Sequence, residues 1–578
     1  MMKKLKAFIA VFMAAITVAS VCACGGEKED PTKTYLDVGV FDAGLGTKYF
    51  DEMKNDFEAY YADEHFEEGK TGVVLRASKM NTEYNPANLI GSMKNYKQVL
   101  YLLNTGDYEA FTAKSLFADV TDVMTDKFLD EDGNLAAVTG KEATKNIEDT
   151  MLEGYADVFK KSDNGNQKYY AVPFMLSVPG IIYDADLFDE QKWYFKEDGT
   201  LGASAADVAA QRCGAGPDGE LGTYDDGLPE KWNDFLTLLA KIRGAGYTPF
   251  TWAQTPSTYQ ISRLFNVMWA NYEGYDDYML NYSLSGNDST LGEIDDSNYV
   301  KLLQQEGRKA ALQAFHDIME KEGNYSEQAT PDGLRKNSHT SAQQEFIESK
   351  DEGDKRIAMF VENSYWEQEA RDVFDGQPDQ NKNGYGKRNF KYMTMPKFVN
   401  MEDKGIADQE NTERVVPATY SESYMCISAQ NTCQNLEVQT RVAKLFIKFV
   451  QQRSQLVKFT ANTGCIRPYD YTVTEEEKES CTPYTRSILE LITEENTKVA
   501  PNLAISTLRR QHTGEKGFNE SNNGFAFVAK VGTNTFYYDP FSYFYKNRDK
   551  SPEDAFKDMH DTIWDLLAED GAIVKRTN

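Results

Sequence analysis

The sequence predicts an α/β protein with more than one domain. Its 578 residues exceed the roughly 150 residues that one domain usually holds. Residues 35–41 alternate as a strand does, and helical spacing of apolar residues follows over 49–61. Further strand-like runs occupy residues 73–77 and 99–103. A repeated order of strand, helix and strand predicts a parallel sheet covered by helices.

Similar patterns continue along the chain. Residues 169–174 and 181–183 read as strands, and a helix with buried-face Trp232 opens near residue 229 and ends at Gly244 and Gly246. A strand over 356–363 runs into a helix, a strand covers 424–427, and a long helix covers 436–459. Asp-Gly pairs between residues 198 and 227 predict a loop-rich insertion, because Asp-Gly suits tight turns.

Composition and charge exclude several classes of protein. Hydrophobic residues make up 41% and aromatic residues 12% of the chain, as expected of a globular protein rather than a disordered one. There are 91 acidic and 62 basic residues, for a net charge of −29. This charge repels nucleic acids and anionic lipid surfaces at long range. We therefore expect no nucleic-acid partner.

The N-terminus has the pattern of a secretion signal. Three lysines precede an apolar run over 7–21, which is shorter than the about 20 residues of a membrane-spanning helix. Residues 21–24 resemble a bacterial lipobox, which implies a lipoprotein signal peptide over 1–23 and a lipid anchor on Cys24; cleavage near Ala23 without lipid is the alternative. Residues 24–33 are predicted to be a flexible tether. The expected location is the extracytoplasmic face of the cell membrane, with the lipid as the only membrane contact.

Cysteines and acidic turns leave two questions open. Cys426 with Cys433, or Cys465 with Cys481, could form disulfides in an exported chain, and the alternative is that these four and Cys213 are buried thiols. No cysteine pair has the two-residue spacing that zinc sites prefer. The acidic loop 216–227 lacks the glutamate that ends an EF-hand, so it is either a looser calcium loop or a solvated loop. No metal or other cofactor is predicted.

Four motifs then occur in a characteristic order. Tyr-Ala-Val-Pro-Phe (170–174) precedes Tyr-x-x-Asp-Leu-Phe (183–188), and a Pro-x-x-Trp-x-x-Phe helix ends in Ala-Gly-x-x-Pro (229–249). An Ala-Met-Phe strand leads into Asn-x-x-Trp (358–366), and Thr-Gly-x-x-x-Pro covers 463–468. This order resembles the extracellular solute-binding proteins, family 1, of carbohydrate ABC importers, which include maltose-binding protein. Lys231 and Cys465 depart from the family pattern, and extra length lies at 190–227, 273–300, 375–390 and 505–550.

The resemblance implies a periplasmic-binding-protein-like fold of type II, in which two α/β lobes close on a ligand at a hinge. Lobe 1 would comprise 34–176 plus 418–467, and lobe 2 would comprise 180–396 plus 470–578. The chain would cross between them near 174–180, 395–417 and 467–472. The implied partners are a small-molecule ligand, most naturally a carbohydrate, and the permease subunits of an ABC importer. A monomer is expected.

Candidate ligand contacts follow from the chemistry of sugars, which offer flat C–H faces edged by hydroxyls. Such ligands need aromatic platforms bordered by carboxylates and amides. The candidates lie near the expected cleft face and are Asp42, Asp107, Tyr108, Tyr183, Trp252, Glu362, Tyr365 and Trp366. Core packing is the alternative for Trp252 and Trp366, and helix or turn capping for Asp107 and Glu362. The aromatic stretch 536–545 could be a further platform or plain packing.

An enzyme is not predicted. The chain has no Gly-x-Ser-x-Gly, Walker or His-Glu-x-x-His motif, and its five histidines are scattered. A glycoside hydrolase needs only two carboxylates, so a surface lipoprotein that cleaves polysaccharide is the alternative function. A binding protein for a polar solute other than a sugar is another.

Overall fold

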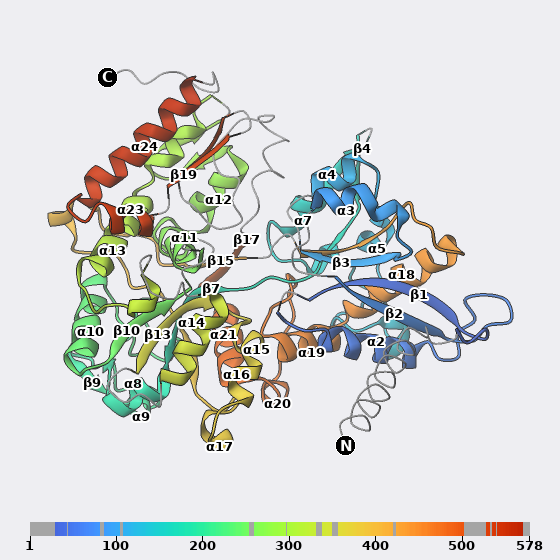
Figure 1. Ribbon diagram of the computed structural model, residues 1–578, viewed down its shortest axis with the longest axis horizontal. Helices are drawn as coiled ribbons and strands as arrows, with labels where there is room; N and C mark the ends of the chain where they lie inside the picture. The colour runs from blue at the N-terminus through green and yellow to red at the C-terminus, as the bar shows by residue number, and fades with distance from the viewer. Residues whose placement is uncertain are drawn as a thin grey trace, which may run out of the picture.

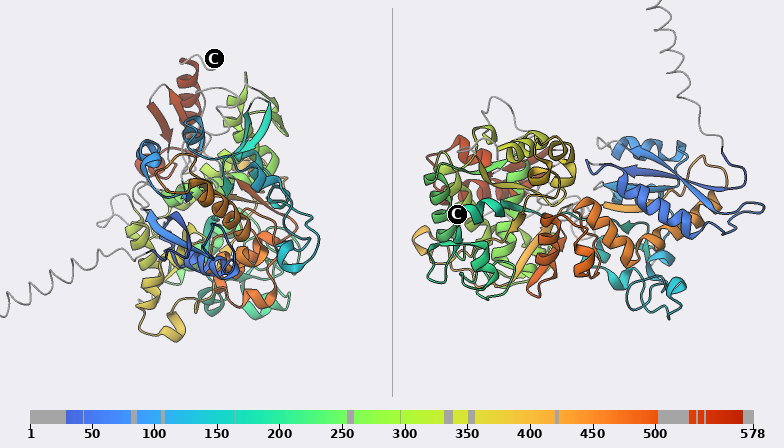
Figure 2. Two further views of the ribbon diagram at one scale, coloured as in Figure 1. Left: turned by 90° about the vertical axis from the view of Figure 1, so that its right-hand side faces the viewer. Right: turned by 90° about the horizontal axis from the view of Figure 1, so that it is seen from below.

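The computed structural model describes residues 29–42, 44–80, 86–104, 108–163, 165–253, 259–295, 297–330, 338–349, 356–419, 423–501, 527–531, 534–538 and 540–569. They form two lobes, each built on its own sheet. Lobe 1 lies at the right of Figure 1 and lobe 2 at the left, and both remain side by side when seen from below (Figure 2).

Lobe 1 contains a five-stranded sheet in the order β2 (Val73–Met80), β1 (Thr34–Phe41), β3 (Leu100–Asn104), β16 (Ser423–Ile427) and β6 (Val172–Pro173). The first three are parallel, and β16 runs antiparallel to both its neighbours. Strand β1 is buried almost throughout because helices cover both faces of the sheet. The other elements of the lobe are α2 (Lys48–Tyr60), α3 (Pro86–Ser92), α4 (Tyr108–Ala113), α5 (Thr121–Thr125), α6 (Ala136–Thr139), α7 (Tyr155–Phe159), β4 (Lys160–Asp163), β5 (Asn166–Tyr169), α18 (Leu436–Val450) and α19 (Arg453–Thr463).

Lobe 2 contains a four-stranded sheet in the order β10 (Thr248–Trp252), β13 (Ile357–Asn363), β7 (Pro179–Asp184) and β14 (Phe390–Met393). Strands β10 and β13 are parallel, and β7 is antiparallel to β13 and β14. The main covering helices are α10 (Trp232–Gly244), α11 (Tyr259–Glu273), α13 (Glu306–Glu320), α14 (His339–Glu348) and α21 (Pro483–Thr493). Trp232 is buried, as predicted, and its Nε1 donates to Asp317 at 2.8 Å.

Further elements complete lobe 2, and several of them lie in the insertions. They are α8 (Ala185–Gln191), β8 (Tyr194–Phe195), β9 (Leu201–Ala203), α9 (Ala205–Ala209), α12 (Tyr275–Ser283), β11 (Gly286–Asp288), β12 (Gly292–Ile294), α15 (Trp366–Glu369), α16 (Arg371–Asp375), α17 (Gln380–Asn383), β18 (Phe527–Val531), β19 (Asn534–Tyr538), α23 (Pro540–Lys546) and α24 (Pro552–Glu569). In α23, Phe541 packs against Trp252 with ring centroids 5.4 Å apart. The described part of the aromatic stretch therefore contributes packing.

The chain passes between the lobes at three places. The first connection joins β6 to β7, the second joins β15 (Arg414–Ala418) to β16, and the third follows α19 and leads to α20 (Glu475–Lys478). Residues 397–413, which the sequence placed in the second crossing, pack on lobe 2: Trp232 N donates to Lys397 O at 2.9 Å, and Gln409 Nε2 donates to Asn271 O at 2.8 Å. Strand β15 also forms a parallel ladder with β17 (Thr497–Pro501).

No helix among the described residues is both long and apolar enough to cross a membrane. The five cysteines from Cys213 to Cys481 are all free thiols, and only Cys433 of these is not buried. Cys213, Cys426, Cys465 and Cys481 therefore fit the buried-thiol alternative, and Cys433 is a half-buried thiol. The predicted lipid-bearing Cys24 lies outside the described residues.

Candidate functional site

The carboxyl ends of strands from both sheets meet at the first connection. This connection leaves lobe 1 after Pro173, beside β16, whose Ser423 pairs with Asn104 at the end of β3. It enters lobe 2 at Pro179, which pairs with Asn363 at the end of β13. Open α/β sheets bind ligands outside the carboxyl ends of their strands. The two edges that suit a ligand therefore face each other across the connection.

Direct contacts tie the two lobes together at this place. Ser177 of the first connection lies 3.0 Å from Ser364 between the hydroxyl oxygens, and it exchanges backbone hydrogen bonds with Thr419 of the second connection at 2.7 and 2.8 Å. Thr419 Oγ1 also donates to Asn363 Oδ1 at 3.0 Å. Gly464, which ends α19 of lobe 1, lies so close to lobe 2 that a Cβ on it would be 2.8 Å from Ser364 O.

A cluster of charged side chains lies on the lobe 2 side of this junction, and we call Glu362, Glu369 and Arg263 the acid cluster. Glu362 comes from β13, Glu369 from α15 and Arg263 from α11. Glu369 Oε2 accepts from Gln343 Nε2 at 2.5 Å. The cluster reaches lobe 1, because a Cβ on Gly44, in the turn after β1, would lie 2.5 Å from Glu369 Oε1.

Burial disfavours ionisation of both carboxyl groups. It raises the pKa of Glu362 to about 8, with repulsion from Glu369 adding to the effect and attraction to Arg263 opposing it. Burial also raises the pKa of Glu369, against the attraction of His339, whose Nε2 lies 3.5 Å from Glu369 Oε1. Shifted carboxyl groups beside an interdomain junction are typical of functional sites.

The predicted contacts of lobe 1 lie in different settings. Asp42 follows β1 directly, forms an ion pair with Lys79, and is two residues from Gly44 at the acid cluster. Tyr108 is buried in the core, where its OH donates to Phe159 O at 2.9 Å. Asp107 lies outside the described residues. Of the two that the structure describes, Asp42 lies near the junction and Tyr108 lies in the core.

The aromatic candidates of lobe 2 are all buried in this structure. Trp366 is 0% exposed and packs among other buried aromatic rings. The centroid of its ring lies 5.1 Å from that of Phe390. Tyr183 packs against Phe188 at 4.7 Å. Neighbouring side chains cover the rings of Trp366 and Tyr183 in this structure, so contact of either ring with a ligand stays a prediction.

Trp252 and Tyr365 are the other two aromatic candidates of lobe 2. Trp252 ends β10, the strand beside β13, and is 0% exposed between Tyr325 and Phe541. Tyr365 precedes α15 and is nearly buried. Glu362, the remaining candidate, is in the acid cluster itself.

Sequence reasoning missed Glu369, Arg263 and the two glycines at the junction. Arg263 is about a hundred positions before Glu362 in the chain, and packing of α11 against β13 brings them together. Glu369 comes three residues, or about one helical turn, after the recognised Asn-x-x-Trp motif. The motif could therefore have pointed to Glu369.

An arginine from another part of the chain pairs with the acidic side chains of loop 216–227. Arg414 of β15 contacts Asp218 at 2.5 Å, Asp225 at 3.0 Å and also Glu494. Because the guanidinium pairs with two carboxylates of the loop, the loop takes part in an ion-pair network that joins the insertion to β15. The calcium interpretation finds no support in this arrangement.

Among the described residues, one group of three side chains has the spacing of metal ligands, namely His316, Asp317 and Glu320. Asp317 already accepts from Lys404 Nζ at 3.0 and 3.1 Å and from Trp232. Its carboxylate is therefore used in joining α13 to its neighbours.

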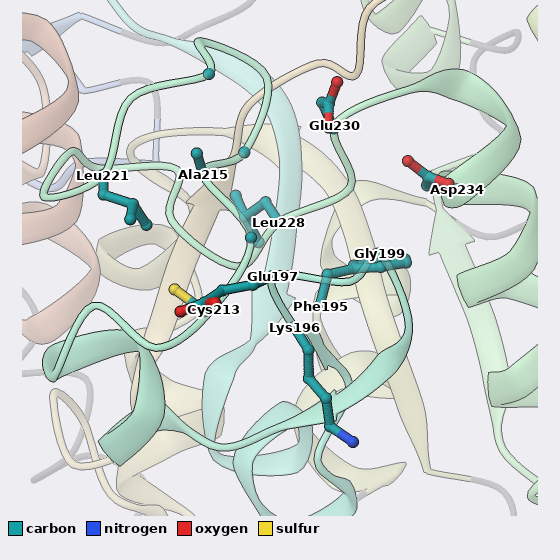
Figure 3. Close-up of a pocket in the computed structure, with 13 residues that line it drawn as sticks. Phe195, Lys196, Glu197, Gly199, Cys213, Ala215, Leu221, Leu228, Glu230 and Asp234 are labelled. Carbon is teal, nitrogen blue, oxygen red and sulfur yellow. The ribbon is translucent and has the colours of Figure 1, made fainter.

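A separate cavity of about 410 Å³ lies within the first insertion (Figure 3). It is lined by the β8–β9 turn and by the loop after Cys213, with Glu230 and Asp234 on another side. The cavity belongs to lobe 2 alone and is distinct from the junction of the lobes.

Comparison with known proteins identifies the fold. No family model matches the chain, and no curated protein sequence matches it. The solved apo structure of RafE from Streptococcus pneumoniae is 12% identical, with a TM-score of 0.52 over 94% of this chain and 100% of that chain. The cyclic α-maltosyl-1,6-maltose binding protein from Arthrobacter globiformis is also 12% identical, with a TM-score of 0.50 over 93% of this chain and 100% of that chain. The chain has the α/β, two-lobe fold of the type II solute-binding proteins, as the sequence predicted.

Proposed function

We propose that the protein is a lipid-anchored, extracytoplasmic receptor that binds a carbohydrate between its lobes and delivers it to the permease of an ABC importer. The observation that carries this proposal is the acid cluster at the junction where the carboxyl ends of both sheets face each other. The similarity of fold to the maltosyl-maltose binding protein supports a sugar as the ligand class. The protein acts as a monomer and leaves its ligand chemically unchanged.

Capture rests on a shift of population between open and closed lobes. A ligand that contacts both lobes only when they are close favours closure by its difference in affinity for the two states. The proposed contacts are Asp42 from lobe 1 and Trp252, Glu362, Tyr365 and Glu369 from lobe 2. Asp107 stays a predicted contact. Carboxyl groups at these positions suit the hydroxyl groups of a sugar, because they can accept or donate hydrogen bonds.

Thermal unfolding with a panel of solutes tests the ligand class. A panel of raffinose, maltose, xylobiose and chitobiose, with amino acids as the comparison, should contain a saccharide that raises the melting temperature. Ligand at a hundred times its dissociation constant should add about 2.7 kcal/mol to the free energy of unfolding. A shift with amino acids alone would contradict the sugar ligand, and release of cleaved saccharide would favour the hydrolase.

Removal of the lipid-bearing cysteine tests the anchor. Cys24→Ala should move the protein from the membrane fraction to the medium, because stable attachment depends on the acyl chains. Cys22→Ala is the matched control and should leave the protein in the membrane fraction. Immunoblots of the two fractions measure the result. Retention of the Cys24→Ala variant on the membrane would contradict lipidation at this residue.

A further inference from the structure

Glu362 has a hydrogen-bonding pattern that distinguishes its two carboxyl oxygens. Its side chain lies at the carboxyl end of β13, and the residue is 1% exposed. Oε1 accepts from Asn363 N at 2.9 Å and from Asn363 Nδ2 at 3.2 Å. Oε2 is buried and has no hydrogen-bond partner among the residues that the structure describes. Oε1 is therefore already satisfied as an acceptor, and Oε2 can form a further hydrogen bond.

The groups around Glu362 come from several packed elements. Glu369 of α15 repels its negative charge, and Arg263 of α11 attracts it. Tyr484 of α21 also interacts with it electrostatically. Around Glu369 lie His339 of α14 and Cys465 of the third connection. Burial and the second carboxyl together favour the neutral form of Glu362 at neutral pH.

A neutral carboxyl group carries its proton on one oxygen. The two N–H donors of Asn363 point at Oε1, so a proton on Oε1 would oppose them, whereas a proton on Oε2 meets no donor in the described residues. The O–H group therefore belongs on Oε2. A buried donor without an acceptor is unfavourable, and a ligand oxygen placed there would supply the missing acceptor.

We propose that Glu362 recognises the ligand as a neutral acid, with Oε2–H donating a hydrogen bond to an oxygen acceptor of the ligand. This inference rests on the proposed function and adds the class of ligand group. Hydroxyl, ring and glycosidic oxygens accept such a bond, whereas an ammonium group does not. At this position the site therefore takes an oxygen of a polyhydroxylated solute rather than the ammonium group of an amino sugar.

This role makes ligand affinity depend on pH in a stated direction. Only the protonated form of Glu362 donates, so the apparent affinity scales with the protonated fraction. With the pKa raised to about 8, that fraction falls from about 0.9 at pH 7 to about 0.1 at pH 9. Affinity should accordingly fall about tenfold over this interval. An ammonium ligand would show the opposite trend, because it binds the ionised carboxylate.

Isothermal titration calorimetry at pH 7 and pH 9 tests the proposal, using raffinose, maltose, xylobiose, chitobiose and glucosamine. The wild-type protein should bind a neutral saccharide about tenfold more weakly at pH 9. Glu362→Gln keeps the acceptor oxygen for Asn363 and replaces the O–H by an amide donor. This variant should bind with nearly the same affinity at both pH values. Glu369→Gln removes the repulsion, so the fall in affinity should begin at a lower pH.

Glu367→Gln is the matched control. Glu367 is also buried on α15 and its pKa is raised to about 7 by burial, but it bonds to Thr482 and is not in the acid cluster. This variant should keep the pH dependence of the wild type. Wild-type affinity that is equal at both pH values or higher at pH 9 would overturn the inference, as would a Glu362→Gln variant that keeps the wild-type fall.

The outcomes separate this inference from the proposed function. Binding of a saccharide without the pH dependence contradicts the role of Glu362 and leaves the receptor function in place. If no saccharide binds, the receptor function is contradicted. Infrared difference spectra of the ligand-free protein then test whether Glu362 is protonated. A protonated-carboxyl band at pH 7 that Glu362→Gln removes supports the neutral acid. A spectrum that Glu362→Gln leaves unchanged overturns it.

Discussion

Replacing Asp184 by alanine should lower the free energy of unfolding by about 3–5 kcal/mol, because it leaves two buried guanidinium groups without their carboxylate. Asp184 is fully buried and bonds to Arg356 at 2.8 Å and to Arg388, which is buried as well. Its other oxygen accepts from Leu187 N at 3.1 Å at the start of α8. Denaturation by urea, followed by circular dichroism, measures the loss.

Glu190→Gln is the control for Asp184→Ala. Glu190 contacts the same Arg356 at 2.7 Å, but its side chain is 53% exposed. Exposed ion pairs contribute about 0–1 kcal/mol, so this variant should unfold nearly as the wild type does. Equal losses for the two variants would show that burial of the Asp184 charge is not the source of the effect.

Replacing Gly464 by alanine should weaken ligand binding about 5- to 150-fold, equivalent to about 1–3 kcal/mol. The added Cβ would lie 2.8 Å from the backbone oxygen of Ser364 in the other lobe, so the lobes could not approach as they do here. The ligand is held between the lobes, so a smaller population of the closed state lowers the apparent affinity. Calorimetry with the saccharide from the panel measures this change.

Gly140→Ala separates the effect on the lobes from backbone strain. Gly140 also ends a helix in the left-handed conformation, with φ of 69° against 68° for Gly464, but a Cβ there would contact nothing within 4 Å. Both variants carry the cost of an alanine in that conformation. Gly464→Ala alone should lose affinity. A similar loss in both would refute the lobe contact as its cause.

Local patterns predicted the elements of this fold well. The helix that begins at Trp232 ends at Gly244, close to the expected bounds. Both boundaries depend on neighbouring residues: apolar spacing and the glycines that interrupt it. The order of such elements was then sufficient to recognise two lobes.

Side-chain environments were harder to predict. Trp366 lies at a helix start beside the junction, and the sequence does not reveal that Phe346, Phe360 and Phe390 enclose its ring. The acidic loop near Asp218 suggested a cation for a similar reason, since its partner Arg414 is 196 positions away. Contacts between segments far apart in the chain determine both the burial of Trp366 and the partner of the acidic loop. The spacing of apolar residues carries no information about such contacts.

The order of strands in the two sheets has a consequence for synthesis. All four strands of the lobe 2 sheet lie between Pro179 and Met393, so this sheet can assemble from one continuous stretch of chain. In lobe 1, β16 lies between β3 and β6 and is made more than 300 residues after β3. Closing so large a loop slows assembly. The lobe that contains the first strands of the chain is thus the last to finish folding.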